Sequence, residues 1–250
     1  RSTTSSFTSV KPITDGYLCV GHLGFYGNYS GIYLTKLDLN GNVKWCKPVT
    51  EPEEDYQAAF FGNCLVDTYD GNYAVASEKG TTGETTDRIL TKITPNGDTL
   101  WQKRYYTTAR DVYNQVIATT DWGYMLAGWS EDYYPNGSFS NAYMQLVKTD
   151  YKGDTLWTHA YPDEEGAVLL YAEQTQDNGY ILSGYRYSNA SLYDMIVIKV
   201  GEFGNEEWRK TFGTDQSDGG CRVYQCPDGT YALLGIIDAN DGLHNDLYLV

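Results

Sequence analysis

Short, mostly apolar segments run along most of the chain and are separated by polar turn residues, for example over residues 124–129 and 142–149. These segments are rich in the β-branched and aromatic residues that strands prefer. The i, i+3, i+4 spacing of an amphipathic helix is absent. Asp-Gly and Asn-Gly pairs separate many of the segments and favour tight hairpin turns, because Gly tolerates positive φ. The pattern predicts an all-β protein built from short antiparallel strands.

A Lys, a Gly and a Trp recur in this order, with the Trp nine residues after the Lys and four after the Gly in every copy. The copies are Lys36, Gly41 and Trp45; Lys92, Gly97 and Trp101; Lys148, Gly153 and Trp157; and Lys199, Gly204 and Trp208. A turn with Asp, Gly and Tyr precedes each copy, and a fifth such turn stands at 228–231. Self-similarity at this period is typical of propellers and other repeat folds.

The repeat therefore predicts one β-propeller domain over residues 1–250, with five four-stranded antiparallel blades. The units span about 6–50, 56–106, 111–162, 166–213 and 219–250, and the last one is truncated. Two alternatives stay open: five blades close with one three-stranded blade, or the ring has more blades and the native polypeptide is longer. The four repeat Trp residues are expected to wedge between blades, and the repeat Lys to be solvated or to snorkel.

The pattern D-G-x-Y followed by K-x-D-x-x-G-D-T-L-W-x-K-x-Y matches best at 92–105 and 148–161. It resembles tandem repeats of large secreted bacterial and archaeal surface proteins, which often carry a C-terminal domain for type IX secretion. The resemblance covers essentially the whole chain, although the sorting domain is missing. It implies a propeller and an extracellular or cell-surface location, but no single activity.

Charge narrows the range of partners. The formal net charge is −15, with 18 Lys and Arg against 33 Asp and Glu. The electrostatic field of this negative charge repels phosphate backbones and anionic lipid, so nucleic acid is not an expected partner. No run of 18 apolar residues occurs, which argues against membrane insertion.

Long, variable loops between the second and third strands of each unit are the candidate ligand-binding face, because binding residues concentrate in such loops. Tyr and Trp beside Asn and Gly suit sugar rings. The candidate residues are Tyr26, Tyr29, Trp129, Tyr133, Tyr134, Tyr185 and Tyr187. Ordinary packing of a Tyr-rich protein would explain the same residues.

Acidic residues gather in the connections between units, including Asp111 and Asp218, and are expected to be mostly solvated. Calcium is a candidate ligand of such oxygens, with Asp238, Asn240 and Asp241 as a weak site, although the spacing and the final Glu of a calcium loop are missing. No other cofactor is expected.

These observations predict a non-enzymatic extracellular binding or adhesion module of a larger surface protein, with a glycan or another surface protein as partner. A structural module that mediates protein–protein contacts is the first alternative. A carbohydrate-active enzyme that uses paired carboxylates is the second, although no pair stands out in the sequence.

Overall fold

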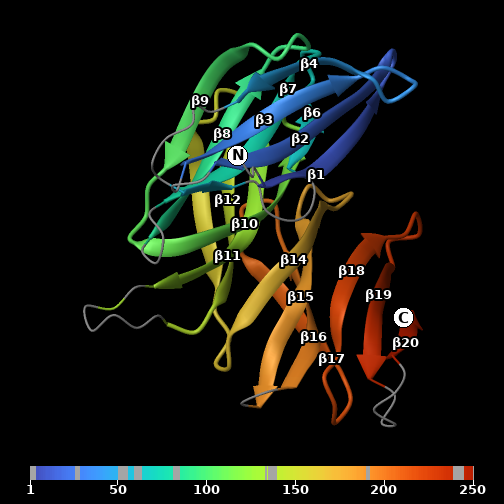
Figure 1. Cartoon of the computed structure of the whole chain (residues 1–250). Helices are drawn as coiled ribbons and strands as arrows, with labels where there is room; N and C mark the ends of the chain where they lie inside the picture. Colours follow the sequence, from blue (N-terminus) through green and yellow to red (C-terminus); the bar gives the residue numbers. More distant parts are fainter. Residues whose placement is uncertain are drawn as a thin grey trace.

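The computed structural model describes residues 4–25, 29–49, 56–58, 64–80, 85–132, 134, 140–189, 192–238 and 245–249. These residues form twenty β-strands, so the predicted all-β fold class is confirmed (Figure 1). This part of the chain contains no helix long and apolar enough to cross a membrane.

The first two units follow the repeat boundaries closely. The first sheet contains β1 (Thr4–Ile13), β2 (Gly16–Phe25), β3 (Tyr29–Leu37) and β4 (Val43–Pro48) in that order. The second unit contains β5 (Tyr56–Ala58), β6 (Leu65–Asp67), β7 (Tyr73–Gly80), β8 (Thr86–Ile93) and β9 (Thr99–Tyr105). Both β5 and β6 pair with β7, so the first strand of this unit is described as two short segments.

The remaining three units repeat the same antiparallel order. The third unit contains β10 (Ala109–Ala118), β11 (Tyr124–Asp132), β12 (Tyr143–Thr149) and β13 (Thr155–Tyr161), and it joins the second through a parallel pairing of β10 with β8. The fourth contains β14 (Ala167–Gln174), β15 (Tyr180–Asn189), β16 (Leu192–Val200) and β17 (Glu206–Phe212). The fifth has three described strands, β18 (Gly219–Gln225), β19 (Tyr231–Asp238) and β20 (Asn245–Leu249).

Cross-strand register explains the constant spacing of Lys and Trp. The two residues face each other across the third and fourth strands of the first four units. The pairs are Lys36 with Trp45, Lys92 with Trp101, Lys148 with Trp157, and Lys199 with Trp208. The intervening Gly adopts positive φ in every copy, between 79° and 82°, which the tight turn requires.

The repeat Lys is not solvated in the second to fourth units, which corrects that part of the expectation, whereas the Lys36 side chain in the first unit is 19% exposed. Its ammonium group pairs with the Asp of the turn between the first and second strands of the same unit. The distances are 2.7 Å for Lys36–Asp15, 2.6 Å for Lys92–Asp70, 2.7 Å for Lys148–Asp121 and 2.9 Å for Lys199–Asp177. The Lys side chain is buried in the second to fourth units, so the ion pair offsets the cost of desolvating it.

The repeat Trp lies at the junction between its own unit and the next. Trp101 packs against Gly153 in the β12–β13 turn of the third unit. The centroid of its ring lies 6.0 Å from that of Tyr124. Lys103 pairs with Asp154 at 2.8 Å, and the Tyr105 hydroxyl donates to the Gly153 carbonyl at 2.9 Å. Trp45 and Trp157 contact Gly97 and Gly204 in the same way, and Trp208 packs against Tyr231.

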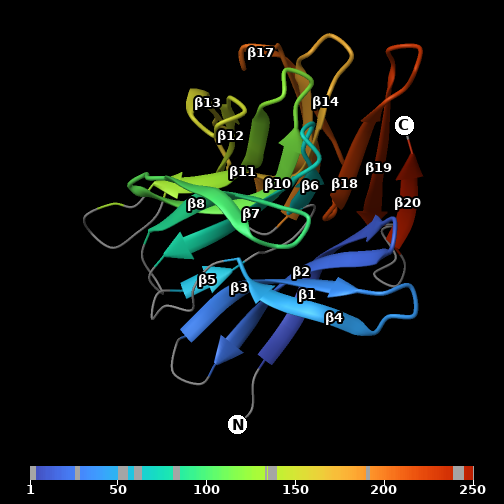
Figure 2. The ribbon, with the colours of Figure 1, turned by 90° about the horizontal axis from the view of Figure 1, so that it is seen from above.

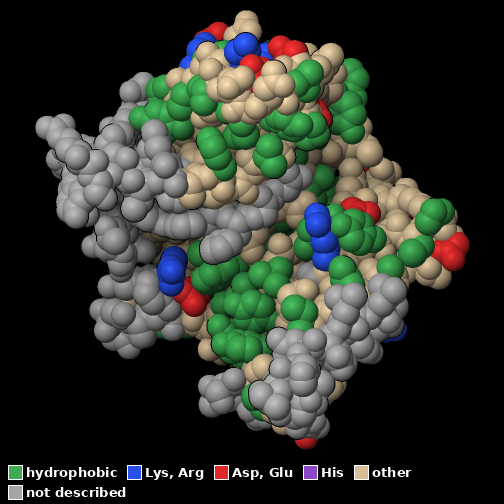
Figure 3. Space-filling model, turned by 45° about the vertical axis from the view of Figure 1, so that its right-hand side comes forward, with side chains coloured by type: hydrophobic (Ala, Val, Ile, Leu, Met, Phe, Trp, Pro, Cys, Tyr) green, Lys and Arg blue, Asp and Glu red, His purple; other side chains and the backbone are tan. Residues whose placement is uncertain are grey.

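The sheets follow one another around the molecule from the first to the fifth (Figure 2). Buried apolar clusters join consecutive units, for example Met125 and Ala127 of the third with Leu182 and Ile198 of the fourth. The described strands of the fifth sheet pack against the fourth, and no extensive contact joins them to the first. The fifth and first sheets look close from above but lie apart in Figure 1. Hydrophobic side chains are visible in several groups on the side shown in Figure 3.

Candidate functional site

The structure describes only some of the residues predicted to bind ligand. Tyr26, Tyr133, Asn240 and Asp241 lie outside the described residues. Tyr29 begins β3 and Asp238 ends β19, but their side chains are not described. Trp129, Tyr134, Tyr185 and Tyr187 remain, and they belong to the third and fourth units.

Three tyrosines of the fourth unit form one cluster on the long-loop face. Tyr185 and Tyr187 are two residues apart on β15, so they share one side of the strand, and Tyr187 pairs in register with Tyr193 of β16. Tyr193 lies 5.1 Å from Tyr185 and 5.2 Å from Tyr187 between ring centroids, and the rings are inclined at 75° and 53°. We call these three residues the tyrosine cluster.

The tyrosine cluster is partly accessible to solvent. Tyr185 and Tyr187 are half-buried, and burial raises the pKa of both hydroxyls. Both therefore stay protonated at neutral pH, when each can donate and accept a hydrogen bond. Tyr193 is 37% exposed and is the most accessible ring of the three.

The loop between the third and fourth units contacts the tyrosine cluster and holds it in place. Gly166 has a φ of 94°, and a Cβ at this residue would lie 3.3 Å from the Tyr187 ring. The Tyr187 backbone N–H donates to the Gly166 carbonyl at 3.0 Å. Arg186 donates to Asp163 through Nε at 3.1 Å and Nη2 at 2.9 Å. These hydrogen bonds therefore hold the loop against β15, the strand that carries Tyr185 and Tyr187.

Trp129 and Tyr134 lie in the third unit. Trp129 is half-buried at the far end of β11, where the Arg110 guanidinium lies 5.8 Å from its ring centroid. Tyr134 is exposed in the connection that follows β11. The structure brings Tyr185 and Tyr187 together, whereas no direct contact of Trp129 or Tyr134 with them is described.

A polar pocket of about 360 Å³ opens between the second and third units. Its wall includes Arg88 of β8 and Asp111 of β10, which are both almost completely buried. Asp111 therefore does not fit the expectation of a solvated acid, and neither does the buried Asp218. The reason in both cases is local hydrogen bonding, for example from Ser130 and Thr107 to Asp111, both at 2.6 Å.

The buried charges around this pocket are largely paired with protein groups. Arg88 donates to Gln145 and, at 3.0 Å, to the Ser130 hydroxyl, and its Nη2 lies 3.7 Å from Asp111. Glu78 is also buried and accepts the backbone N–H of Tyr113. Burial raises the pKa of Glu78 to about 8. The sequence reasoning missed Arg88 and Glu78, and their one signal is a charge at a strand position that faces the core.

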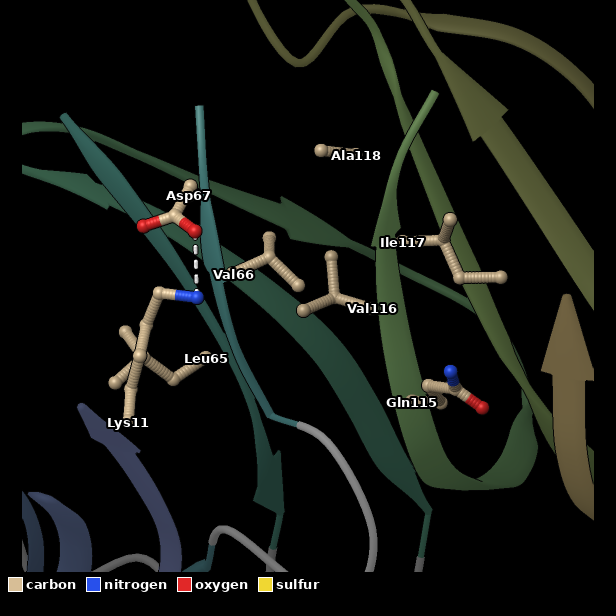
Figure 4. Close-up of a pocket in the computed structure, with 8 residues that line it drawn as sticks. All are labelled: Lys11, Leu65, Val66, Asp67, Gln115, Val116, Ile117 and Ala118. Atoms are coloured by element: carbon tan, nitrogen blue, oxygen red, sulfur yellow. Dashed lines mark ion pairs between the residues drawn. The ribbon is translucent and has the colours of Figure 1, made fainter. Parts of the chain in front are cut away.

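A second space lies where the first strands of three units converge (Figure 4). It measures about 260 Å³ and is lined by Lys11 of β1, residues 65–67 of β6 and residues 115–118 at the end of β10. Lys11 pairs with Asp67 at 2.5 Å inside it. Since both charges are matched, the space is more easily explained as part of the scaffold than as a site for a charged ligand.

The described residues contain no cluster of three or more His, Cys, Asp or Glu side chains that could hold a metal ion. The residues predicted to bind calcium are not among those whose side chains are described.

Comparisons with known proteins give the fold alone. No protein-family model matches the chain, and no curated protein matches its sequence. A cobalt-substituted apocarotenoid oxygenase from Synechocystis is similar in structure, with a TM-score of 0.56, 13% identity, and coverage of 94% of this chain and 55% of that chain. A chimera of this oxygenase and RPE65 gives a TM-score of 0.57 at 12% identity, with coverage of 98% and 59%.

An endo-arabinase from Bacteroides thetaiotaomicron covers 98% of this chain and 96% of its own, but its TM-score of 0.44 at 12% identity carries no argument. This chain spans a little over half the length of the oxygenase structures. What these comparisons support is an all-β architecture shared with proteins of otherwise unrelated sequence.

Proposed function

We propose that the chain is a β-propeller from a secreted or cell-surface protein, and that it serves as a non-enzymatic module for binding or adhesion to glycans. Each repeat unit would be one blade. Three observations support the propeller: the sheets follow one another around the molecule, the first strands of three units line one space, and Trp side chains lock each unit to the next.

The observation that carries the binding role is the tyrosine cluster. Its rings are inclined to one another, and Tyr193 is partly exposed. Hydrogen bonds hold the neighbouring loop against the strand that carries Tyr187. Tyrosines combine an apolar face with a hydroxyl at the tip, and this combination suits a sugar, whose C–H groups and hydroxyls need both. A rigid base lowers the entropy lost when a ligand binds.

Binding to a glycan array, with and without calcium, tests this proposal. Tyr193→Ala should weaken binding at least about tenfold if the ring contributes about 1.4 kcal/mol or more. Tyr17→Ala is the matched control, because Tyr17 is also 37% exposed but lies in the first unit. Absence of binding by the unmodified chain to any glycan, in either condition, would contradict the proposal.

A structural role in assembly is the second candidate, and a separate observation favours it. Phe7 and Val10 are exposed on β1, whereas Tyr113 and Val116, which occupy the same register positions on β10, are buried. None of the described residues lies within 4 Å of a Cβ built at Gly41, whereas its three counterparts each contact a Trp. The first sheet therefore has an open face of the kind that another unit covers elsewhere.

Sedimentation velocity across a range of concentrations tests the assembly role. Association that is reduced by Val10→Thr, with an unchanged melting temperature of the monomer, would favour it. A monomer at all concentrations would favour the binding role.

A further inference from the structure

An aromatic cleft of about 280 Å³ opens on the opposite face, where the short turns lie. It sits at the junction between the second and third units. Three exposed aromatic residues line it: Tyr69 from the β6–β7 turn, Trp122 from the β10–β11 turn and Tyr151 from the β12–β13 turn. Asp70 and Lys92, the ion pair of the second unit, lie in the same wall. We call this feature the Trp122 cleft.

Trp122 holds a backbone conformation that the fold normally gives to other residues. Its φ is 71°, in the left-handed region. The same turn position holds Gly71 with a φ of 76°, Asn178 with 64° and Gly229 with 86°. Gly and Asn tolerate this region, whereas a residue with a bulky side chain is strained there. Strain of this kind persists where it serves a purpose, so it points to a functional role for the ring.

Packing does not explain why Trp stands at this position. The exposed fractions are 64% for Trp122, 55% for Tyr69 and 54% for Tyr151. Three large, exposed aromatics at one junction bury little surface in return for the strain at Trp122. They are therefore not placed as core residues would be.

The next junction shows what the fold requires at these positions. Between the third and fourth units, Thr120 replaces Tyr69 and Asn178 replaces Trp122. The Thr120 hydroxyl donates to Asn178 Oδ1 at 3.1 Å. Small polar residues therefore close this junction, and the aromatic set is specific to the Trp122 cleft.

Two of the rings stack beside a fixed charge pair. Tyr69 and Trp122 stack with centroids 6.1 Å apart and planes inclined by 15°. Lys92 donates to Asp70 at 2.6 Å, and Thr68 donates to the other carboxylate oxygen at 2.5 Å. Partial burial opposes ionisation of Asp70, but the hydrogen bonds from Lys92 and Thr68 lower its pKa overall. The cleft thus combines apolar faces with an ionised acceptor and a donor.

From this arrangement we infer that the Trp122 cleft binds a neutral sugar ring, with the C–H face of the sugar on the exposed ring of Trp122 and its hydroxyls on Asp70. An anionic ligand would meet the exposed Asp70 and the net charge of −15, and the Lys92 ammonium, whose side chain is 9% exposed, is already paired with Asp70. The inference takes its ligand class from the proposed function, but it names a different site on the other face of the molecule.

Substitution of Trp122 by Gly tests the inference without damaging the turn. Gly occupies the same position in the second and fifth units, so Trp122→Gly should keep or raise the melting temperature. Binding of those neutral oligosaccharides that the Tyr193→Ala variant still binds should fall at least tenfold. Asn178→Gly makes the same backbone change at the next junction, and it should leave binding within twofold of the unmodified chain.

The outcomes separate this site from the tyrosine cluster. Loss of glycan binding in Trp122→Gly, but not in Asn178→Gly, supports the Trp122 cleft. Loss in Tyr193→Ala alone overturns the cleft and leaves the proposed function standing. If the unmodified chain binds no glycan on the array, both the Trp122 cleft and the proposed function are overturned. Binding of a proline-rich peptide or of choline that depends on Trp122, without any sugar binding, would also overturn the ligand class inferred here.

Discussion

Trp101 lies so close to Gly153 that a Cβ on this glycine would stand 2.9 Å from the indole ring. The contact joins the outer strand of the second unit to the last turn of the third. It recurs at two other junctions, where Trp45 meets Gly97 and Trp157 meets Gly204. The glycine thus serves two purposes, because it adopts positive φ and also leaves room for the ring of the preceding unit.

Two glycine substitutions separate these purposes. Gly41 has a φ of 82°, and no residue in the described part of the chain lies within 4 Å of a Cβ built there, so Gly41→Ala should cost about 1 kcal/mol of unfolding free energy from backbone strain alone. Gly153→Ala adds the clash with Trp101 and should cost a further 1–3 kcal/mol, roughly the range for overpacking. Urea denaturation of both variants measures the difference. Equal losses would show that the Trp contact does not restrict this position.

The buried ion pair of the third unit should respond unequally to removal of its two partners. The side chain of Lys148 is 5% exposed, whereas that of Asp121 is 53% exposed. Asp121→Asn leaves a buried ammonium without its counter-charge and should cost about 2 kcal/mol, below the range for fully buried pairs. Lys148→Met leaves a solvated carboxylate and should cost about 1 kcal/mol or less. Chemical denaturation at neutral pH checks the order, and a larger loss in Lys148→Met would contradict it.

Glu78 should make the stability of the chain fall as pH rises from about 4.5 to about 8. Burial raises its pKa in the folded state to about 8, from an ordinary value of 4.5. Between these values the unfolded chain releases the proton and the folded chain keeps it, so the folded state binds more protons and unfolding becomes more favourable with pH. The expected loss is on the order of a few kcal/mol.

Urea titrations of the unmodified chain and of Glu78→Gln from pH 5 to pH 9 measure this dependence. The glutamine keeps an acceptor for the Tyr113 N–H but does not ionise. Parallel curves for the two proteins would mean that Glu78 ionises normally in the folded state.

The thiols should differ sharply in reactivity. Cys46 is exposed, whereas Cys19 and Cys64 are buried, and burial raises the pKa of both buried thiols. Because the thiolate is the reactive form, iodoacetamide should label Cys46 in the native protein and leave Cys19 and Cys64 unmodified until the chain unfolds. Peptide mapping by mass spectrometry checks this. Rapid native labelling of Cys64 would show that the core between the first two units opens readily.

The prediction of the fold from sequence rested on the repeat. The constant spacing between Lys92 and Trp101 reflects a cross-strand pair. This spacing is visible in the sequence because a hairpin fixes the register of its two strands. The ion pair between Lys92 and Asp70 was not predicted, although each residue belonged to a recognised motif. It joins a residue of the third strand to a residue of an earlier turn, and the sequence does not show that these two side chains lie close together.

The candidate site shows the same division. Sequence identified Tyr185 and Tyr187 as loop aromatics, and alternation along a strand is sufficient to place them on one side. Trp122 was not selected, because it stands in a short turn of a kind that usually carries no function. Its one signal is the Trp directly after Asp121, where three other units have Gly and one has Asn.

The sequence by itself determined the all-β class and the constant spacing that places each repeat Lys opposite its Trp. These properties depend on local patterns of alternation and on turn residues, which act over a few neighbouring positions. Only the tertiary structure decided that the repeat Lys is buried, that Asp111 is shielded from water, and that Tyr69 and Trp122 stack across a junction. Burial and contacts between units depend on how the twisted sheets lie against one another, and no local pattern encodes that arrangement.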